Sequence, residues 1–188
     1  MSANEAVVAR PGADEYAPYY GRYISLVSEP DVLAALREQA GETCALLKGV
    51  SEEKSEYRYA PEKWSVKEVL GHVTDTERIF AYRALRISRN DRTPIEGYEQ
   101  DDYVRFGPFR HCRLQDLEEE FLSVRKATLF LFRALENDAW LRRGIANRLE
   151  ISVRAIAYVI AGHVLHHRKI LKDQYLKPPF GEVNSPLR

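Results

Sequence analysis

The sequence predicts an all-α protein, an antiparallel four-helix bundle with a long crossover connection. Four segments carry apolar residues at the three- and four-residue spacing of amphipathic helices, and none shows a convincing strand pattern. A long connection, residues 91–112, separates the second segment from the third and permits one crossover in place of simple up-and-down order. With 188 residues the chain is long enough to form one domain with a real core.

The domain is expected to span residues 16–176. Residues 1–15 are polar and lack periodicity, so we expect a flexible N-terminal arm there. The first helix should begin near residues 28–31, with Pro30 in its first turn, and end at Gly49. Residues 51–63 read as a polar connector.

The second helix has the clearest start signal in the chain. Ser65 and Glu68 fit a capping box, in which each side chain binds the other residue's backbone amide. Trp64 and Val69 fit the hydrophobic staple that often accompanies such a cap. The helical pattern then continues to about Asn90.

Residues 91–112 are too rich in helix breakers for regular structure and too aromatic for a passive linker. Their breakers are Pro94, Gly97, Gly107 and Pro108. Loops of this length are uncommon unless they have a task. The connection is therefore expected to cover a site, to pack its aromatic residues on the end of the bundle, or to do both.

The last two helices follow this connection. The third is expected over residues 114–137, and residues 138–150 join it to the fourth. The fourth begins near Ser152 and ends near Leu176, where Pro178 and Pro179 stop it. Residues 177–188 are expected to form a C-terminal tail.

Composition excludes several classes of protein. Lys plus Arg and Asp plus Glu both total 28, so the chain lacks the basic surplus typical of a nucleic-acid binder. No apolar run reaches membrane-spanning length, and the first residues do not resemble a signal peptide. Cys44 and Cys112 match no metal spacing, and we expect two thiols in a reducing compartment in preference to a disulfide. These observations predict a cytoplasmic protein that binds neither nucleic acid nor membrane.

The fourth segment carries two histidines in its apolar stripe. His163 and His167 are four residues apart, so their rings project from one helical face and can reach a single metal ion. Alternatively they are core residues bonded to carbonyl groups, and two ligands are too few for a catalytic zinc site. His72 in the second helix is the candidate third ligand. It lies about 10 Å from the start of its helix, while the pair lies about 13–20 Å from the end of theirs, so antiparallel helices bring all three together.

Glycine precedes two of these histidines, at Gly71 and Gly162. A glycine inside a helix costs about 1 kcal/mol relative to alanine. Either a close helix approach around a site or ordinary tight helix packing would explain both positions.

Three stretches together carry a family resemblance: Trp64–Glu77, Gly97–Tyr103 and His163–His167. They resemble the DinB-like superfamily of small metalloproteins, in particular its metal-dependent hydrolases and bacillithiol transferases. The similarity runs from roughly Tyr23 to Leu176. It implies a bundle in up-down-down-up order and one divalent ion, zinc or nickel. It also implies His72, His163 and His167 as the ligands, with water completing the shell, and a homodimer.

Such a site suits two reactions on a small-molecule substrate. Water on the ion can attack an ester or amide as a hydrolase requires, or a low-molecular-weight thiol of the bacillithiol type can be directed onto an electrophile. Asp75, one turn from His72, is our predicted general base; Glu68 is the alternative, but the cap occupies it. If neither Asp75 nor Glu77 serves the site, both should lie on a solvated face beside Arg78 or Arg83.

The sequence lacks the motifs of two other classes of metalloprotein. The Glu-x-x-His pairs of a di-iron bundle and the His-Glu-x-x-His motif of zinc proteases are both absent. His166 is expected near the site but not as a ligand, and His111 on the surface. The non-enzymatic alternative is a metal-stabilised bundle acting as a stress-related binding protein. A fourth protein ligand would favour that alternative, and an accessible pocket would favour catalysis.

Overall fold

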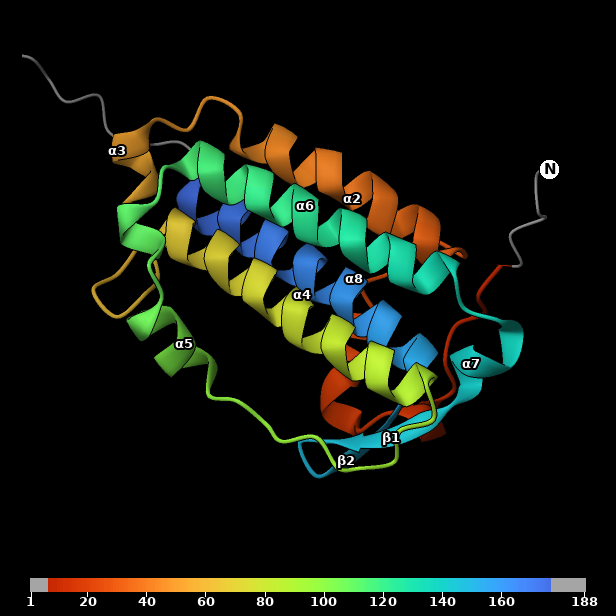
Figure 1. Ribbon diagram of the computed structural model, residues 1–188. Coiled ribbons are helices and arrows are strands. Elements are labelled where there is room, and N and C mark those ends of the chain that lie inside the picture. Colours follow the sequence, from red (N-terminus) through yellow and green to blue (C-terminus); the bar gives the residue numbers. More distant parts are fainter. Residues whose placement is uncertain (1–6, 177–188) are drawn as a thin grey trace, which may run out of the picture.

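The computed structural model describes residues 7–176, and four long helices form its body (Figure 1). They are α2 (Val32–Leu47), α4 (Val66–Ser88), α6 (Leu114–Arg133) and α8 (Val153–Ile170). Helices α2 and α8 run in one direction and α4 and α6 in the other, as the colour order in Figure 1 shows. Helices α4 and α2 each pack against both α6 and α8. The predicted four-helix bundle in up-down-down-up order is confirmed.

Local signals set the helix starts. The Asp31 side chain accepts from the Leu33 amide at 2.9 Å and begins α2, and Gly49 at φ +87° follows its end. At α4 the predicted capping box is present: Ser65 Oγ accepts from the Glu68 amide at 3.3 Å, and Glu68 accepts from the Ser65 amide at 2.7 Å. The polar connector between them contains one short helix, α3 (Glu52–Ser55).

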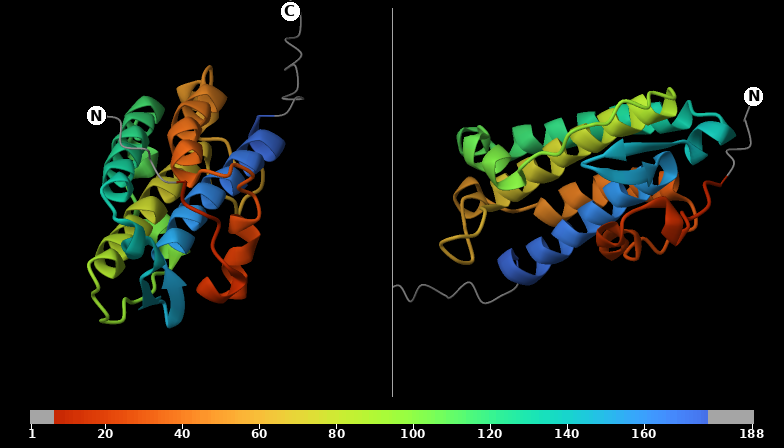
Figure 2. Two further views of the ribbon diagram at one scale, coloured as in Figure 1. Left: turned by 90° about the vertical axis from the view of Figure 1, so that its right-hand side faces the viewer. Right: turned by 90° about the horizontal axis from the view of Figure 1, so that it is seen from below.

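The connection from α4 to α6 is more regular than expected. It holds α5 (Gln100–Phe106) and a 3-10 turn, η3 (Phe109–His111), and it runs back along the outside of the bundle (Figures 1 and 2). The expectation of no regular structure over residues 91–112 is therefore wrong. The breakers lie outside α5: Gly97 precedes it and the extended Gly107 follows it, so they delimit a short helix instead of preventing one.

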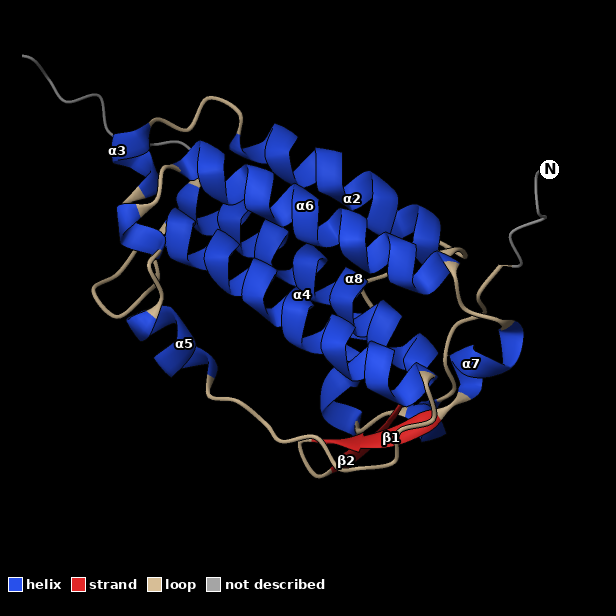
Figure 3. Cartoon of the chain, viewed as in Figure 1, coloured by secondary structure: helices blue, strands red, loops and turns tan. Residues whose placement is uncertain are grey.

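A second difference concerns residues 138–152, where no strand was expected. The segment forms α7 (Asn137–Leu141) and a hairpin of β1 (Arg143–Ala146) and β2 (Leu149–Ser152), the strands shown in red in Figure 3. Asn147 and Arg148 make the two-residue turn at φ 51° and 63°. The Ile95 backbone adds a parallel bridge at Ala146. The hairpin thus ties the crossover connection to the start of α8.

Segments before α2 pack on the bundle. They comprise η1 (Ala13–Glu15), η2 (Pro18–Tyr20) and α1 (Gly21–Ile24), and α1 lies against α8. Of the arm expected over residues 1–15, residues 1–6 lie outside the described residues. Residues 7–15 contact the body: the buried Glu15 carboxylate accepts from Ser152 Oγ and from Arg154 Nε, both at 2.7 Å. At the other end, α8 continues into a π-helical turn, η4 (Leu171–Tyr175), and the expected tail lies outside the described residues.

A buried ion pair joins three of the four helices. Arg125 of α6 donates to both carboxylate oxygens of Glu77 on α4, at 2.7 and 2.8 Å, and to the Leu36 carbonyl of α2 at 2.7 Å. Both charged side chains are 1% exposed. The placement of Glu77 on a solvated face is therefore wrong, because its partner comes from a helix far along the chain. No helix within residues 7–176 has the length and apolarity needed to span a membrane.

Candidate metal centre

The three predicted histidines meet at one point between α4 and α8. The Nε2 atom of His163 lies 3.2 Å from that of His72 and 3.1 Å from that of His167. The candidate ligand atoms of all three lie within 4.8 Å of one another. In the described part of the chain no carboxylate or cysteine joins this cluster.

The spacing suits ligands that share one ion. Two nitrogens bound at about 2.0–2.1 Å lie about 2.9 Å apart at a right angle and about 3.4 Å apart at the tetrahedral angle. The two distances to His163 Nε2, 3.2 and 3.1 Å, fall between these limits. Both distances to His163 are therefore those of ligands that share one divalent ion.

Burial keeps the three imidazoles neutral. His72, His163 and His167 are 2%, 6% and 9% exposed. Burial, with a smaller contribution from the charge of His166, lowers the pKa of His72 to about 4. Burial and the neighbouring histidines hold the pKa of His163 and of His167 well below the usual range. At neutral pH the site offers nitrogen lone pairs, the form in which histidine binds metal.

The two glycines admit other segments to the helices that carry the histidines. A Cβ on Gly162 would lie 2.0 Å from the Tyr23 carbonyl oxygen, and one on Gly71 would lie 2.3 Å from the Phe109 ring. At Gly162 the neighbour belongs to helix α1, so the explanation of a close helix approach around the site holds there, and at Gly71 the neighbour belongs to the 3-10 turn η3. The glycines let α1 and the crossover connection pack directly beside the centre.

Aromatic rings enclose the histidines on two sides. Trp64 lies tilted over His72, with ring centroids 4.6 Å apart, and stacks toward His167 at 6.5 Å and 22°. Tyr23 meets the His163 ring edge to face at 5.3 Å. Neither role was predicted from the sequence, where Trp64 was expected to form the helix staple. For Trp64 a signal existed: it adjoins the cap that sets the level of His72.

Two cavities adjoin the cluster, one beside His163 and the other beside His167. One, of about 510 Å³, is lined by His163 together with aromatic residues of α1, α4 and the crossover connection. The other, of about 290 Å³, is lined by His167 and Trp64. Asp101 lines both. The centre thus adjoins space in which a small molecule could lie.

The predicted general base lies outside this arrangement. Asp75 accepts from Arg78 at 3.0 Å, and Arg78 also binds Glu120 at 2.6 Å. Burial raises the pKa of Asp75, while the Arg78 hydrogen bond acts in the opposite direction. Asp75 lines neither cavity. Its role as a base stays a prediction. Glu68 is engaged by the cap and by Arg58 at 2.6 Å.

His166 packs beside the cluster without joining it, as expected, with its ring centroid 5.1 Å from that of His167. His166 is partly buried and packs edge to face on Tyr23 at 5.5 Å, and burial lowers its pKa. His111 is exposed at the end of η3. Cys44 and Cys112 are free thiols.

Comparison with known proteins supports the fold. The family model described as the DinB superfamily matches residues 35–171. Among solved structures, YfiT from Bacillus subtilis superposes with a TM-score of 0.70 at 12% identity, over 88% of this chain and 91% of that chain. That protein is described as a probable metal-dependent hydrolase with an unusual four-helix bundle topology. No curated protein matches this sequence.

Proposed function

This chain belongs to the DinB superfamily, and from that premise we propose that it is a metal-dependent enzyme acting on a small molecule. His72, His163 and His167 would hold one divalent ion. Neutral imidazole donors suit zinc and nickel, the two ions that we propose.

One observation carries the proposal: the cluster has three donors and adjoins a cavity. A structural zinc site is closed by four protein ligands, whereas a catalytic site has three and keeps a position open. In the described residues the cluster contains three histidines, and His163 forms part of the wall of the 510 Å³ cavity. This arrangement favours catalysis over the alternative of a non-catalytic, metal-stabilised binding protein.

The chain's own residues would prepare the site. An ion held there would supply Lewis acidity toward a substrate carbonyl or toward a water or thiol nucleophile. Trp64 and Tyr23 pack on the histidine rings and would restrict their rotation. Asp75 would take up a proton, which requires that Arg78 share or release its carboxylate.

Hydrolysis is the reaction that we place first. Its support is the structural likeness to a protein described as a probable metal-dependent hydrolase. Transfer of a low-molecular-weight thiol of the bacillithiol type is the second candidate, because the same three-donor site would bind a thiolate. A cytoplasmic location and a homodimer complete the proposal.

The test uses protein stripped by a chelator and reloaded with zinc or nickel. Hydrolysis of 4-nitrophenyl acetate and transfer of cysteine thiolate to 1-chloro-2,4-dinitrobenzene, with loss of chloride, are measured for each form. We expect one reaction to depend on the ion, to be lost in His163→Ala and to persist in His111→Ala. Stoichiometric metal with neither reaction in any form would favour the non-catalytic alternative.

A further inference from the structure

Arg83 of α4 is a buried cation with an incomplete set of partners. The residue is 2% exposed and lines the same 510 Å³ cavity as His163. One terminal nitrogen donates to the Glu96 carbonyl at 3.2 Å, and the Tyr20 hydroxyl is also within its reach. The buried Nε atom has no partner. Within residues 7–176 no carboxylate forms an ion pair with Arg83.

Arg125, which is also deeply buried, shows what complete pairing of an arginine requires in this fold. Arg125 binds both oxygens of Glu77 and the Leu36 carbonyl. Removing a charged group from water is costly unless an opposite charge and hydrogen bonds replace the solvent. Arg125 has both, whereas Arg83 lacks the opposite charge.

Two aromatic rings hold the Arg83 guanidinium without neutralising it. Its central carbon lies 4.8 Å from the Phe80 ring centroid and 6.0 Å from that of Tyr98. Aromatic faces attract a cation but carry no net charge. The Tyr98 hydroxyl is fixed in turn by Thr76 at 2.8 Å. The guanidinium is thus prearranged and retains its positive charge beside the cavity.

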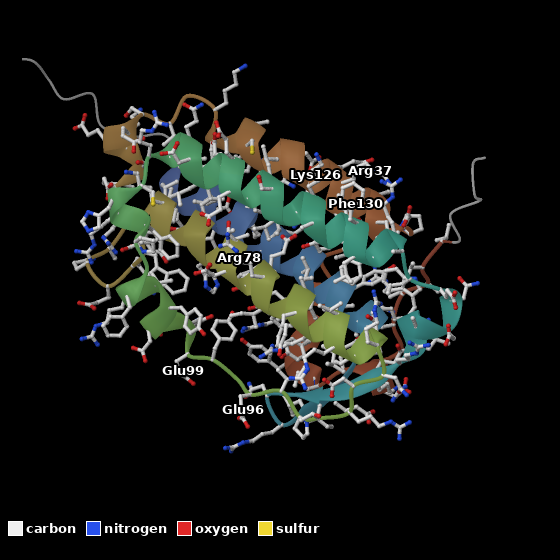
Figure 4. All side chains as sticks on the ribbon, viewed as in Figure 1. Arg37, Arg78, Glu96, Glu99, Lys126 and Phe130 are labelled. Carbon is white, nitrogen blue, oxygen red and sulfur yellow. The ribbon has the colours of Figure 1, made fainter. Side chains whose placement is uncertain are left out.

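The cavity's acidic residues do not take the place of a counter-ion. Glu99 and Asp101 line it but are exposed, and Figure 4 shows Glu96 and Glu99 on the connection outside α4. Solvent screens exposed charges strongly and buried ones much less. Among the charged residues that line the cavity, Arg83 is the buried one and is therefore the least screened.

The cavity extends along α4, because Thr76, Phe80 and Arg83 all line it, and His163 lines it as well. Thr76 lies at the level of His163, since both contact the same small hollow between α4 and α8. Arg83 is seven residues further along α4, a rise of about 10 Å. Tyr19, Tyr20 and Phe80 line the cavity and supply apolar surface.

We propose that Arg83 anchors the carboxylate of an elongated, apolar or aromatic small-molecule acid whose other end reaches the histidine centre. The planar fork of arginine matches the two oxygens of a carboxylate, and an anion would supply the missing charge. The inference deepens the proposed function and rests on it for the site of reaction, but the anion site itself does not require a metal.

The test compares 1-naphthaleneacetate with its neutral isostere 1-naphthaleneacetamide. Binding to the full chain is measured by calorimetry, with and without zinc, for wild type, Arg83→Gln, Arg83→Lys and Arg105→Gln. Arg105 is an exposed arginine outside the cavity lining and controls for the loss of one positive charge. We expect wild type and Arg105→Gln to prefer the acid by at least about tenfold, and Arg83→Gln to lose that preference.

Arg83→Lys keeps the positive charge but not the planar guanidinium, so it should still prefer the acid over the amide, by a smaller factor than wild type. If Arg83→Gln does not fold, the comparison of Arg83→Lys with wild type decides the matter. Equal binding of acid and amide by wild type, absence of binding of both, or an unchanged preference in the Arg83 variants would overturn the proposal. Because the preference is expected with and without zinc, it can hold even if the metal-dependent reaction fails.

Discussion

Glu77→Gln should destabilise the bundle far more than the same change at a surface ion pair. The substitution leaves the Arg125 guanidinium buried, with a neutral amide where two carboxylate oxygens accept hydrogen bonds at 2.7 and 2.8 Å. Breaking a buried pair by removing one charge costs about 3–5 kcal/mol. That is a large part of the 5–15 kcal/mol by which a domain is typically stable.

Glu120→Gln is the matched control. Its pair with Arg78 has a similar length, 2.6 Å, but the side chains are 39% and 46% exposed. An exposed pair contributes about 0–1 kcal/mol. The free energy of unfolding is measured by urea titration with circular dichroism detection. A cost for Glu77→Gln within 1 kcal/mol of the cost for Glu120→Gln would refute the argument that this ion pair joins the helices.

Further predictions concern packing, pH and the base. Gly162→Ala should lower the melting temperature, because the added Cβ would lie 2.0 Å from the Tyr23 carbonyl oxygen. The control Gly41→Ala should raise the melting temperature, because its Cβ would meet nothing within 4 Å and alanine has the higher helix propensity. Burial raises the pKa of Glu15, but Arg154 and hydrogen bonds from Gly12 and Ser152 outweigh it and lower the pKa to about 2. At pH values above 4.5, the ordinary pKa, the Glu15 carboxylate should therefore contribute on the order of 3 kcal/mol to the free energy of unfolding. That contribution should be lost as the pH falls toward 2, so the unfolding free energies of wild type and Glu15→Gln should converge there. Asp75→Asn should keep its metal and lose at least about a hundredfold in hydrolysis; unchanged turnover would remove Asp75 from the reaction.

The parts of the fold predicted from sequence are those set by local interactions. Ser65 and Glu68 are three residues apart, and their capping box needs no partner from elsewhere in the chain. The level of His72 in the bundle follows from that start. The helical spacing of His163 and His167 is equally local. Residue spacing therefore predicted the four helices and the meeting of the three histidines, and the family resemblance supplied the up-down-down-up order.

The remainder depends on contacts between distant segments. Nothing near Glu77 in sequence indicates that Arg125 will neutralise it, so the solvated face was a reasonable but wrong expectation. The hairpin turn at Asn147 and Arg148 lacks the glycine that usually marks such turns. Likewise, Gly162 packs against Tyr23, a residue far away in the sequence.

Whether the three histidines hold a metal ion is decided by the metal content of purified, untagged protein, measured by elemental analysis for wild type, His163→Ala and His111→Ala. We expect about one equivalent of zinc or nickel in wild type and in the exposed-histidine control His111→Ala, and loss of that equivalent in His163→Ala with helical content retained. If wild-type protein contains no metal and takes up neither added ion, the three histidines are core residues only and no metal centre exists.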